Sequence, residues 1–396
     1  MHFCFIKKQF LEYLAQTSPT PPMYHFTKAK GVYLFDKKGN KYIDLISGIA
    51  VNNIGHSNKK VLKAIKMQSQ RFMHQMVYGE YVITPQVKLA KLLSDHLPDA
   101  LNSVYFLNSG SESVEGALKL AKKYTGKKKI VALKNAYHGS TSGALSLMSD
   151  EYYSGPFKPL LPNVYFAELN NHQSLNLIDD NTACLILEPI QAESGYHPAT
   201  QKFLEDAREK CTKNNALLIF DEIQSGMGRT GNLFAFEQYG VVPDVLLTAK
   251  ALGGGMPLSA FISSKQIMSS LTDNPILGHI TTFGGHPVSA AAAIASLTYI
   301  RDKDLMVEVD DKESLFRQLL KHPKIKAVTG KGLMLAVHVE NFDQVEFVMK
   351  HCIENGVIID WFLYNQNALR VSPPLIISEK QITKVCNTII NALNKL

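Results

Sequence analysis

The sequence predicts an α/β protein built on a mostly parallel sheet, followed by a small α+β domain. Short apolar runs recur between residues 104 and 262, and helix-length segments such as 114–123 and 201–213 separate several of them. Strands buried on both faces read as continuous apolar runs, so this alternation is typical of a parallel sheet covered by helices. The predicted strands of this sheet are 104–107, 130–133, 164–166, 183–187, 217–220, 245–247 and 258–262.

The chain on either side of this region has a different pattern. The first 30 residues hold a short amphipathic segment and then Pro19, Pro21 and Pro22, which indicate an extended arm. Residues 31–36 and 41–45 flank a glycine-containing turn and predict a hairpin. Apolar periodicity predicts helices near 58–68, where Val61, Leu62, Ile65 and Gln68 share a face, and near 86–97, where Val87, Leu89, Ala90 and Leu93 do. After a buried alanine-rich helix at 287–300, segments 333–339, 343–354 and 368–371 predict the small α+β domain.

Composition favours a protein of the reducing cytoplasm and gives little support for nucleic-acid binding. A chain of 396 residues with 45% hydrophobic content can bury a large core, and its net charge of +7 is only mildly basic. The Lys127–Lys129 run predicts a solvated turn, because no aromatic residues or binding motif accompany it as in a nucleic-acid site. The 5 cysteines form no Cys-x-x-Cys pair, so we expect neither disulfides nor a metal site. No segment is long and apolar enough to predict a membrane span.

Two chemically important residues follow neighbouring predicted strands. Asp221 ends the run 216–220, and Lys250 comes shortly after the run 245–247. Ligands of open parallel sheets bind beyond the carboxyl ends of the strands. A lysine amine and a carboxylate are the two groups that pyridoxal 5'-phosphate (PLP) needs, one for its aldehyde and one for its ring nitrogen. The alternative is ordinary surface chemistry, so other residues at the same edge decide between the two interpretations.

The first predicted strand leads into Asn108-Ser109-Gly110-Ser111-Glu112 and then into a helix. Ser109 and Glu112 fit a capping box. A glycine-containing turn that enters a helix offers free N–H groups and the positive end of the helix dipole, which suit a phosphate. The alternative is a plain helix cap.

Other strand ends carry further candidates. Tyr137 and His138 follow the second strand, where an aromatic ring could stack on a planar cofactor; otherwise they are a core tyrosine and a loop histidine. Glu188 and Glu193 follow the fourth strand and are either structural ion-pair partners or site residues. Arg370 is a candidate partner for Glu193, because its planar guanidinium suits a carboxylate, although an arginine before two prolines is often at the surface.

Taken together, these motifs resemble the class III (subgroup III) aminotransferases, the group with acetylornithine, ornithine and 4-aminobutyrate aminotransferases. The resemblance extends from Gly31 to the C-terminal region. No nucleophile elbow, zinc-protease motif, Walker loop or dinucleotide fingerprint competes with it. The motifs are those at 48–56, 108–112, 137–139, 188–191, 221–229, 250–255 and 282–287.

The resemblance implies fold type I of the PLP-dependent transferases, with a mostly parallel seven-stranded sheet in the large domain. We expect an N-terminal arm and part of the small domain in 1–55, the large PLP-binding domain in 56–286 and the rest of the small domain in 287–396. It also implies a homodimer with shared active sites.

The same resemblance implies a role for each site residue. Lys250 bonds to the cofactor and moves protons, and Asp221 pairs with the ring nitrogen. Arg370 binds the carboxylate of glutamate or 2-oxoglutarate, and Glu193 masks it while an ω-amino donor is bound. The other implied cofactor contacts are Ser109, Gly110, Ser111, Tyr137, His138, Glu188, Gln224 and, from the neighbouring subunit, Thr282; Ile49 is an implied substrate contact.

The sequence departs from the family pattern at a position that bears on the amino donor. Acetylornithine and ornithine enzymes usually carry an arginine where this chain has Ser140, and that arginine binds the α-carboxylate of the donor. His286, Ala192 and Ser194 also replace residues common in the family. The predicted reaction is transfer of an amino group from an amine or ω-amino acid to 2-oxoglutarate. The alternatives are a PLP-dependent racemase or epimerase of the same fold and a non-enzymatic cofactor sensor.

Overall fold

The computed structural model of the protein describes residues 2–77 and 79–396, and its centre is a seven-stranded sheet. All seven predicted strands belong to it, in the order β4-β12-β11-β10-β7-β5-β6. β12 is antiparallel to both of its neighbours, and the other pairs are parallel, so the mostly parallel sheet is confirmed. The strands are β4 (Ser103–Leu107), β5 (Lys129–Leu133), β6 (Val164–Ala167), β7 (Thr182–Leu187), β10 (Leu217–Asp221), β11 (Val245–Thr248) and β12 (Ser259–Ser263).

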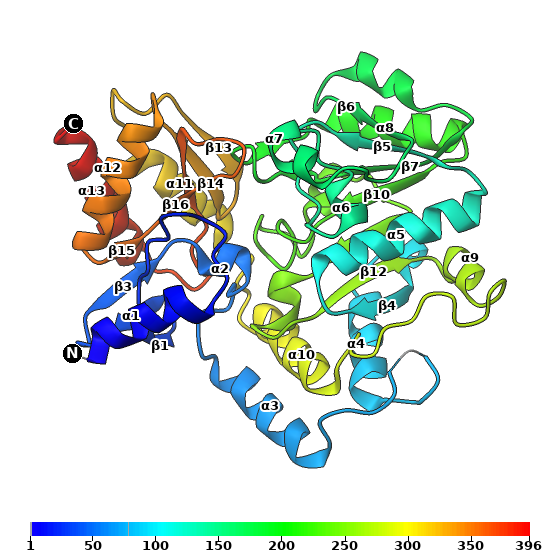
Figure 1. Ribbon diagram of the computed structural model, residues 1–396, viewed down its shortest axis with the longest axis horizontal. Coiled ribbons are helices and arrows are strands. Elements are labelled where there is room, and N and C mark those ends of the chain that lie inside the picture. The colour runs from blue at the N-terminus through cyan, green and yellow to red at the C-terminus, as the bar shows by residue number, and fades with distance from the viewer. Residues whose placement is uncertain (1, 78) are drawn as a thin grey trace.

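Helices cover both faces of this sheet (Figure 1). Successive residues of a strand point to opposite faces, and both faces of β10 are buried. Leu217 and Ile219 pack with α5 (Gly110–Thr125), whereas Leu218 and Phe220 join the core that includes α8 (Gln201–Lys213). The continuous apolar runs of the sequence therefore follow from burial on both sides.

Further helices pack near the edge of the sheet that carries β4. The alanine-rich α10 (Pro287–Asp302) is buried, as predicted, and contacts α3 (Lys59–Arg71) and α4 (Thr84–Ser94). The helices expected near 58–68 and 86–97 are present as α3 and α4, but Leu62 and Val87 of the expected faces are 52% and 55% exposed. A helix turns about 100° per residue, so its neighbour α10 covers a stripe of residues three and four apart and leaves these two outside.

The second part of the molecule combines the two ends of the chain, which lie together in Figure 1. β3 (Lys41–Asp44) pairs with β15 (Val357–Ile358), so an N-terminal hairpin shares a sheet with a C-terminal strand. That sheet has the order β1-β2-β3-β15, and a second one has the order β13-β14-β17-β16. The domain boundaries given above stay a prediction. The remaining elements of this part are α1 (His2–Tyr13), β1 (Phe26–Lys30), β2 (Tyr33–Asp36), α2 (Ser47–Ala50), α11 (Val309–Leu319), β13 (Ala327–Lys331), β14 (Met334–His338), α12 (Phe342–Glu354), β16 (Asp360–Trp361), β17 (Ala368–Val371) and α13 (Glu379–Asn394).

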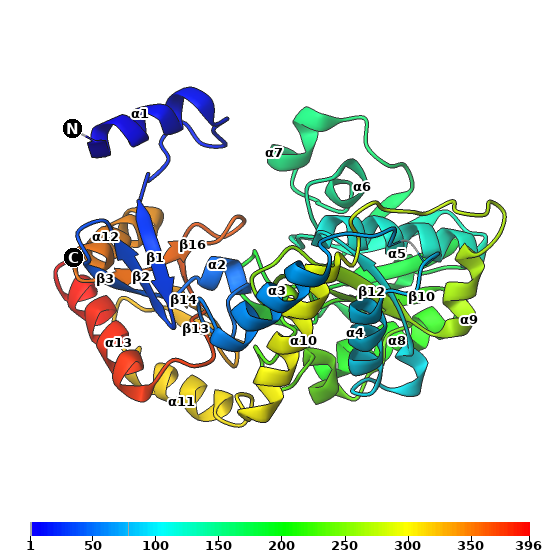
Figure 2. The same cartoon turned by 90° about the horizontal axis from the view of Figure 1, so that it is seen from below.

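Several short elements follow strands of the central sheet, and some of them border the space between the two parts. Figure 2 shows α7 (Glu151–Ser154) and α6 (Ser142–Leu145) on the side of that space opposite the small sheets. The short pair β8 (Ile190–Gln191) and β9 (His197–Pro198) follows the end of β7, and α9 (Lys265–Met268) follows β12. Among the described residues, no helix combines the length and the hydropathy that a membrane crossing requires.

Candidate active site

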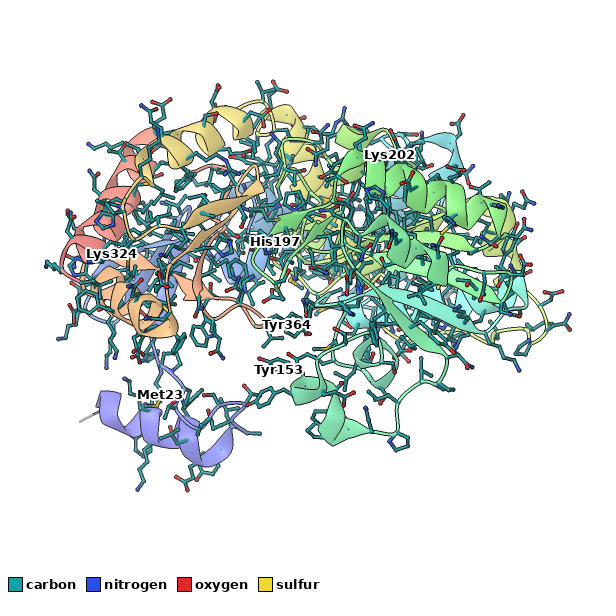
Figure 3. All side chains as sticks on the ribbon, turned by 90° about the horizontal axis from the view of Figure 1, so that it is seen from above. Met23, Tyr153, His197, Lys202, Lys324 and Tyr364 are labelled. Atoms are coloured by element: carbon teal, nitrogen blue, oxygen red, sulfur yellow. The ribbon has the colours of Figure 1, made fainter. Side chains whose placement is uncertain are left out.

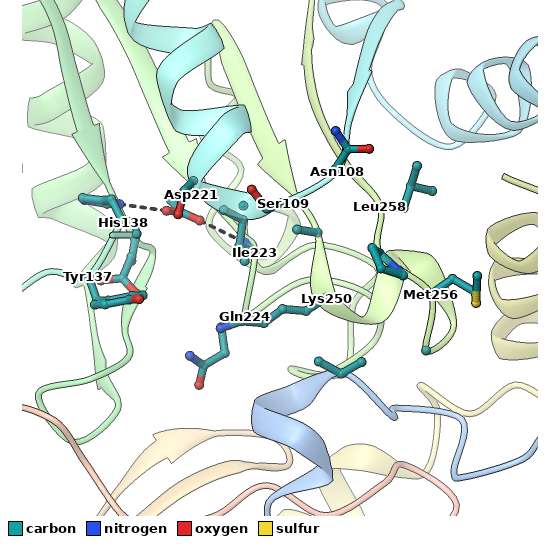
Figure 4. A pocket seen from close by; sticks show the side chains of 18 residues that line it. Asn108, Ser109, Tyr137, His138, Asp221, Ile223, Gln224, Lys250, Met256 and Leu258 are labelled. Atoms are coloured by element: carbon teal, nitrogen blue, oxygen red, sulfur yellow. Dashed lines mark hydrogen bonds and ion pairs between the residues drawn. The ribbon is translucent and has the colours of Figure 1, made fainter. Parts of the chain in front are cut away.

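The carboxyl ends of the central strands open into a cavity of about 360 Å³ (Figure 4). β10 and β11 are neighbours in the sheet, so Asp221 and Lys250 reach the same cavity from adjacent strands. The expected convergence of the two residues is therefore present. The cavity is lined by Val51, Asn108, Ser109, Gly110, Ser111, Tyr137, His138, Gly139, Glu188, Asp221, Ile223, Gln224, Ala249, Lys250, Gly255, Met256, Pro257 and Leu258.

Asp221 is held rigidly at one end of the cavity. Its side chain is buried, and its two oxygens have different partners: Oδ1 accepts from the N–H of Ile223 at 3.0 Å, and Oδ2 lies 2.7 Å from Nδ1 of His138. Because an ionised carboxylate only accepts hydrogen bonds, the proton of the His138 pair is on Nδ1. The carboxylate is thus fixed in orientation and keeps lone pairs for a cationic partner.

Lys250 places its side-chain amine at the cavity. It begins a short 3-10 helix, Lys250–Gly253, with a φ of +47°, a left-handed conformation that costs a residue with a side chain about 1 kcal/mol or more. Within the described part of the chain, no hydrogen bond or ion pair engages its Nζ atom. Burial lowers the pKa of Lys250, and the negative charge of Glu193 opposes that shift. Lowering the pKa favours the neutral amine, which is the nucleophilic form.

The N-terminus of α5 forms another wall of the cavity. Ser109 Oγ accepts from the N–H of Glu112 at 3.3 Å, and Glu112 Oε2 accepts from the N–H of Ser109 at 3.3 Å, which confirms the capping box. The first N–H groups of a helix have no partner within it, so those of Gly110 and Ser111 are available to an anion. The capping box therefore holds the start of α5 in a conformation that suits the binding of a phosphate group.

Glycines allow the backbone to approach closely at this wall. A Cβ atom on Gly139 would lie 2.1 Å from Ser111 Oγ, and the φ of Gly139 is +128°. A Cβ atom on Gly110 would lie 2.9 Å from Cδ1 of Ile223. Gly139 therefore requires glycine, because its φ is positive and Ser111 leaves no room for a Cβ atom, whereas at Gly110 a Cβ atom would have to displace only the end of the Ile223 side chain.

Tyr137 and Glu188 form the side of the cavity next to Asp221. The N–H of Tyr137 donates to Glu188 Oε2 at 3.2 Å, and the Tyr137 hydroxyl lies 3.1 Å from Ser140 Oγ. Burial raises the pKa of Glu188 well above its ordinary value, and the nearby charge of Asp221 adds to the shift. Ser140 is exposed at the rim, so the position expected to decide the donor adjoins the cavity without lining it.

A buried ion pair lies next to the cavity. Arg370 and Glu193 are 2% and 7% exposed, and two parallel hydrogen bonds join them: Nη1 to Oε1 at 3.0 Å and Nη2 to Oε2 at 2.9 Å. Gln224 connects this pair to the cavity, because its Nε2 donates to Glu193 Oε1 at 3.4 Å and its own side chain lines the cavity. The pairing that the sequence suggested is present.

Charge interactions explain how this pair is ionised. Burial acts to raise the pKa of Glu193, but the charge of Arg370 and its hydrogen bonds prevail and bring the pKa below its ordinary value. Asp360, a second acidic partner, accepts from Nε of Arg370 at 3.1 Å. Burial raises the pKa of Asp360 to about 6, against the opposing effect of Arg370.

Two tyrosines join the two parts of the molecule beside this pair. Tyr153, in α7, packs edge to face against Tyr364 with ring centroids 5.4 Å apart, and both lie at the space between the two parts (Figure 3). The Tyr153 hydroxyl donates to the carbonyl oxygen of Leu363 at 2.9 Å. The N–H of Leu363 in turn donates to Glu193 Oε2 at 3.3 Å. The position of Glu193 is therefore linked to the contact between the two parts.

Several residues of the site were not predicted. The hydroxyl of the fully buried Tyr196 donates to Gln224 Oε1 at 2.8 Å and lies 2.7 Å from Ser372 Oγ. Tyr196 lies only three positions after Glu193, and this closeness in the sequence could have indicated that it belongs to the site. No local pattern marks Asp360, because the register of two short strands brings it to Arg370.

Besides Arg370 and Glu193, two further predicted contacts lie outside the cavity lining. Thr282 is exposed, although the neighbouring Thr281 accepts from Asn108 at 3.2 Å. Ile49 is 38% exposed and has a φ of +60°, whereas Val51 from the same segment lines the cavity. The roles expected for Thr282 and Ile49 stay predictions.

The groups around the cavity fit PLP. A free amine, a fixed carboxylate and an open helix N-terminus are the partners of an aldehyde, a pyridine nitrogen and a phosphate. The fold and the site thus define a PLP-dependent enzyme of fold type I.

Comparisons with known proteins identify the family. Residues 13–393 match the family model of aminotransferase class III. An acetylornithine aminotransferase of Caldanaerobacter subterraneus is 37% identical over 97% of this chain and 98% of its own. A [LysW]-aminoadipate semialdehyde/glutamate semialdehyde transaminase of Sulfurisphaera tokodaii is 38% identical over 79% of this chain and 81% of its own. The crystal structure of an ornithine aminotransferase from Toxoplasma gondii superposes with a TM-score of 0.92 at 28% identity and covers 100% of this chain and 95% of that one. The chain belongs to the class III aminotransferases and is a PLP-dependent transaminase.

Replacing Gly139 with alanine tests the close approach at the phosphate wall. The added methyl group must displace Ser111, so we expect G139A to weaken retention of PLP by roughly tenfold or more, a loss of about 1.4 kcal/mol. Equilibrium dialysis followed by the visible absorbance of the bound cofactor measures this change. G155A is the matched control, because the Cβ atom there has no close backbone contact. Equal retention of PLP by G139A and G155A would contradict the assignment of this wall.

Proposed function

We propose that the protein moves an amino group from a primary amine or ω-amino acid to 2-oxoglutarate. The observation that carries this proposal is the buried, doubly hydrogen-bonded Arg370–Glu193 pair beside the cavity. Such an arginine suits the carboxylate of an oxo acid, and an internal carboxylate can cover it while a donor without that group reacts. One pocket would in this way accept two unlike substrates in turn.

Each residue of the pocket has a distinct task in this proposal. PLP, when bound, bonds to an amine and withdraws electrons from the reacting carbon. Lys250 would hold the cofactor through its aldehyde group, and its amine would act as a general base toward the donor carbon. Asp221 keeps a proton on the ring nitrogen, and His138 fixes the orientation of that carboxylate. Tyr137 would stack on the cofactor ring, and the Gln224 amide would hydrogen-bond the hydroxyl group of that ring. Glu188 fixes the Tyr137 backbone.

The backbone N–H groups of Gly110 and Ser111 would hold the phosphate, with Ser109 as the helix cap. Thr282 extends this contact across a dimer: we propose that it reaches the phosphate in a second copy of the chain. Its segment also exposes Ile276, Leu277, Ile280 and Phe283, and an apolar surface of this kind suits a subunit interface. We therefore propose that the protein is a homodimer.

We also propose a cytoplasmic location. Cys184, Cys211, Cys352 and Cys386 are buried and free, which suits the reducing cytoplasm.

The residue at position 140 bears on the identity of the amino donor. Acetylornithine and ornithine aminotransferases are among the relatives, and Ile49 belongs to the stretch that resembles them. Ser140, however, offers a neutral hydroxyl group where those enzymes usually bind an α-carboxylate. We therefore propose a donor that needs no cation at this position. A racemase or epimerase is disfavoured, because such an enzyme has no second oxo acid and hence no use for a carboxylate that covers Arg370.

Replacing Lys250 with alanine tests the proposed reaction at its centre. A panel of acetylornithine, ornithine, lysine and 4-aminobutyrate is offered with 2-oxoglutarate, and glutamate formation is measured. We expect the wild-type protein to form glutamate with at least one amine, and K250A to lose turnover by a factor of at least about 10³, because it lacks the general base. The visible band of the covalently attached cofactor should also vanish. Failure of the wild-type protein with every donor, or an intact band in K250A, would contradict the proposal.

Replacing Ser140 with arginine tests the argument about the donor. The new guanidinium should gain about 1.5–3 kcal/mol with a donor carboxylate, roughly a ten- to a hundredfold rise in kcat/KM. Steady-state kinetics with ornithine, and with the alkylamine of equal length that lacks the carboxylate, measures it. We expect a gain with ornithine alone. If S140R improves neither donor, the hydroxyl group at Ser140 does not decide the donor.

A further inference from the structure

Arg370 has two acidic partners, and they belong to different kinds of structure. Glu193 lies in the loop between β8 and β9, where Gly195 and Tyr196 have φ values of +110° and +53°. Asp360 lies in β16, directly opposite Arg370 in the antiparallel pairing of β16 with β17. β17 is also paired with β14 on its other side. A loop can change its backbone more easily than a strand that is paired in register, so Glu193 is the partner that can leave.

The two acids occupy different edges of the guanidinium group. Glu193 takes the end formed by Nη1 and Nη2, at 3.0 and 2.9 Å. Asp360 accepts from Nε at 3.1 Å, and the carbonyl oxygen of Trp361 accepts from Nη2 at 3.2 Å on the same side. β16 therefore holds one side edge of the group through a side chain and a backbone oxygen. Withdrawal of Glu193 would expose the end and leave that side edge bound.

Aromatic rings restrict the guanidinium group further. Its central carbon lies 4.6 Å from the ring centroid of Phe362 and 5.8 Å from that of Tyr196. The two rings pack edge to face, with their centroids 4.7 Å apart. These contacts limit rotation of the group, but neither ring supplies a charge. Once Glu193 leaves, Asp360 is the acidic group that remains hydrogen-bonded to Arg370 among the described residues.

We propose that Asp360 is a positioning residue that keeps Arg370 aimed at the substrate while Glu193 is withdrawn. The Nη1 and Nη2 atoms then meet the carboxylate of the oxo acid in the place that Glu193 vacated. This inference rests on the proposed function, because it concerns the half-reaction with 2-oxoglutarate. It divides the two acids into a movable cover, Glu193, and a fixed support, Asp360.

The test compares the two half-reactions of the holoenzyme at pH 8. In D360A the Nε atom loses its charge-assisted hydrogen bond, and the arginine can turn away from its productive orientation. We expect the KM for 2-oxoglutarate to rise about tenfold or more, whereas kcat/KM for an alkylamine donor changes less than about twofold. D360N keeps an oxygen acceptor at the same place and should restore most of the affinity. The dissociation constant of glutarate, which has both carboxylates but no oxo group, should follow the same order.

The controls separate a positioning role from general damage. Asp206 pairs with Lys202 on α8 and is 24% exposed, the same fraction as Asp360, so D206A should leave both half-reactions unchanged. Thermal unfolding shows whether D360A is folded; if it is not, D360E, which shifts the carboxylate by one methylene, should also raise the KM for 2-oxoglutarate. Equal losses in both half-reactions, no loss in either, or no rescue by D360N would overturn the inference. A wild-type protein that does not use 2-oxoglutarate would instead overturn the proposed function.

Discussion

The buried pair of Arg370 and Glu193 is the interaction on which the arrangement of the site depends. An unpaired charge in the interior costs several kcal/mol, so a buried arginine requires a partner at every stage of its work. Arg370 comes from a strand of the small C-terminal sheet, and Glu193 from a loop that follows the central sheet. Their two hydrogen bonds therefore also connect the two parts of the molecule, and any anionic substrate that binds Arg370 must replace this contact.

The same requirement explains the residues gathered around the pair. Tyr196, Gln224 and the backbone of Leu363 each make a hydrogen bond with Arg370 or Glu193. Gln224 reaches both the pair and the cavity, so a change at the arginine is felt next to the cofactor site. The negative charge of Glu193 also acts on Lys250, against the effect of burial on the pKa of that amine. A change at the Arg370–Glu193 pair would therefore also change the charges that act on Lys250.

The sequence predicted the central sheet well, because its strands are buried on both faces and their apolar runs are continuous. The capping box at Ser109 was predicted because it is local: Ser109 and Glu112, three positions apart, exchange hydrogen bonds with each other. The convergence of Asp221 and Lys250 was predicted because ligands of open parallel sheets bind beyond the carboxyl ends of the strands. The pairing of Glu193 with Arg370 was predicted from the chemistry of a carboxylate and a guanidinium group. The roles of the two residues were predicted from the family resemblance.

The residues that escaped prediction depend on long-range geometry. Asp360 faces Arg370 through strand register, and Tyr196 reaches Gln224 because its loop folds back, and neither arrangement leaves a periodic pattern in the chain. The exposed Leu62 and Val87 show the converse: apolar spacing marked a face of each helix, but the width of the covered stripe depends on the neighbouring helix. Domain boundaries, the dimer and the individual site roles stay predictions for the same reason, since each depends on contacts beyond a local pattern.

A crystal structure of the holoenzyme with glutarate would test the central claim most directly. We expect a glutarate carboxylate on Nη1 and Nη2 of Arg370, with Glu193 turned away and the distance from Nε to Asp360 still close to 3.1 Å. A structure in which glutarate is bound elsewhere while the Arg370–Glu193 hydrogen bonds remain intact would contradict it.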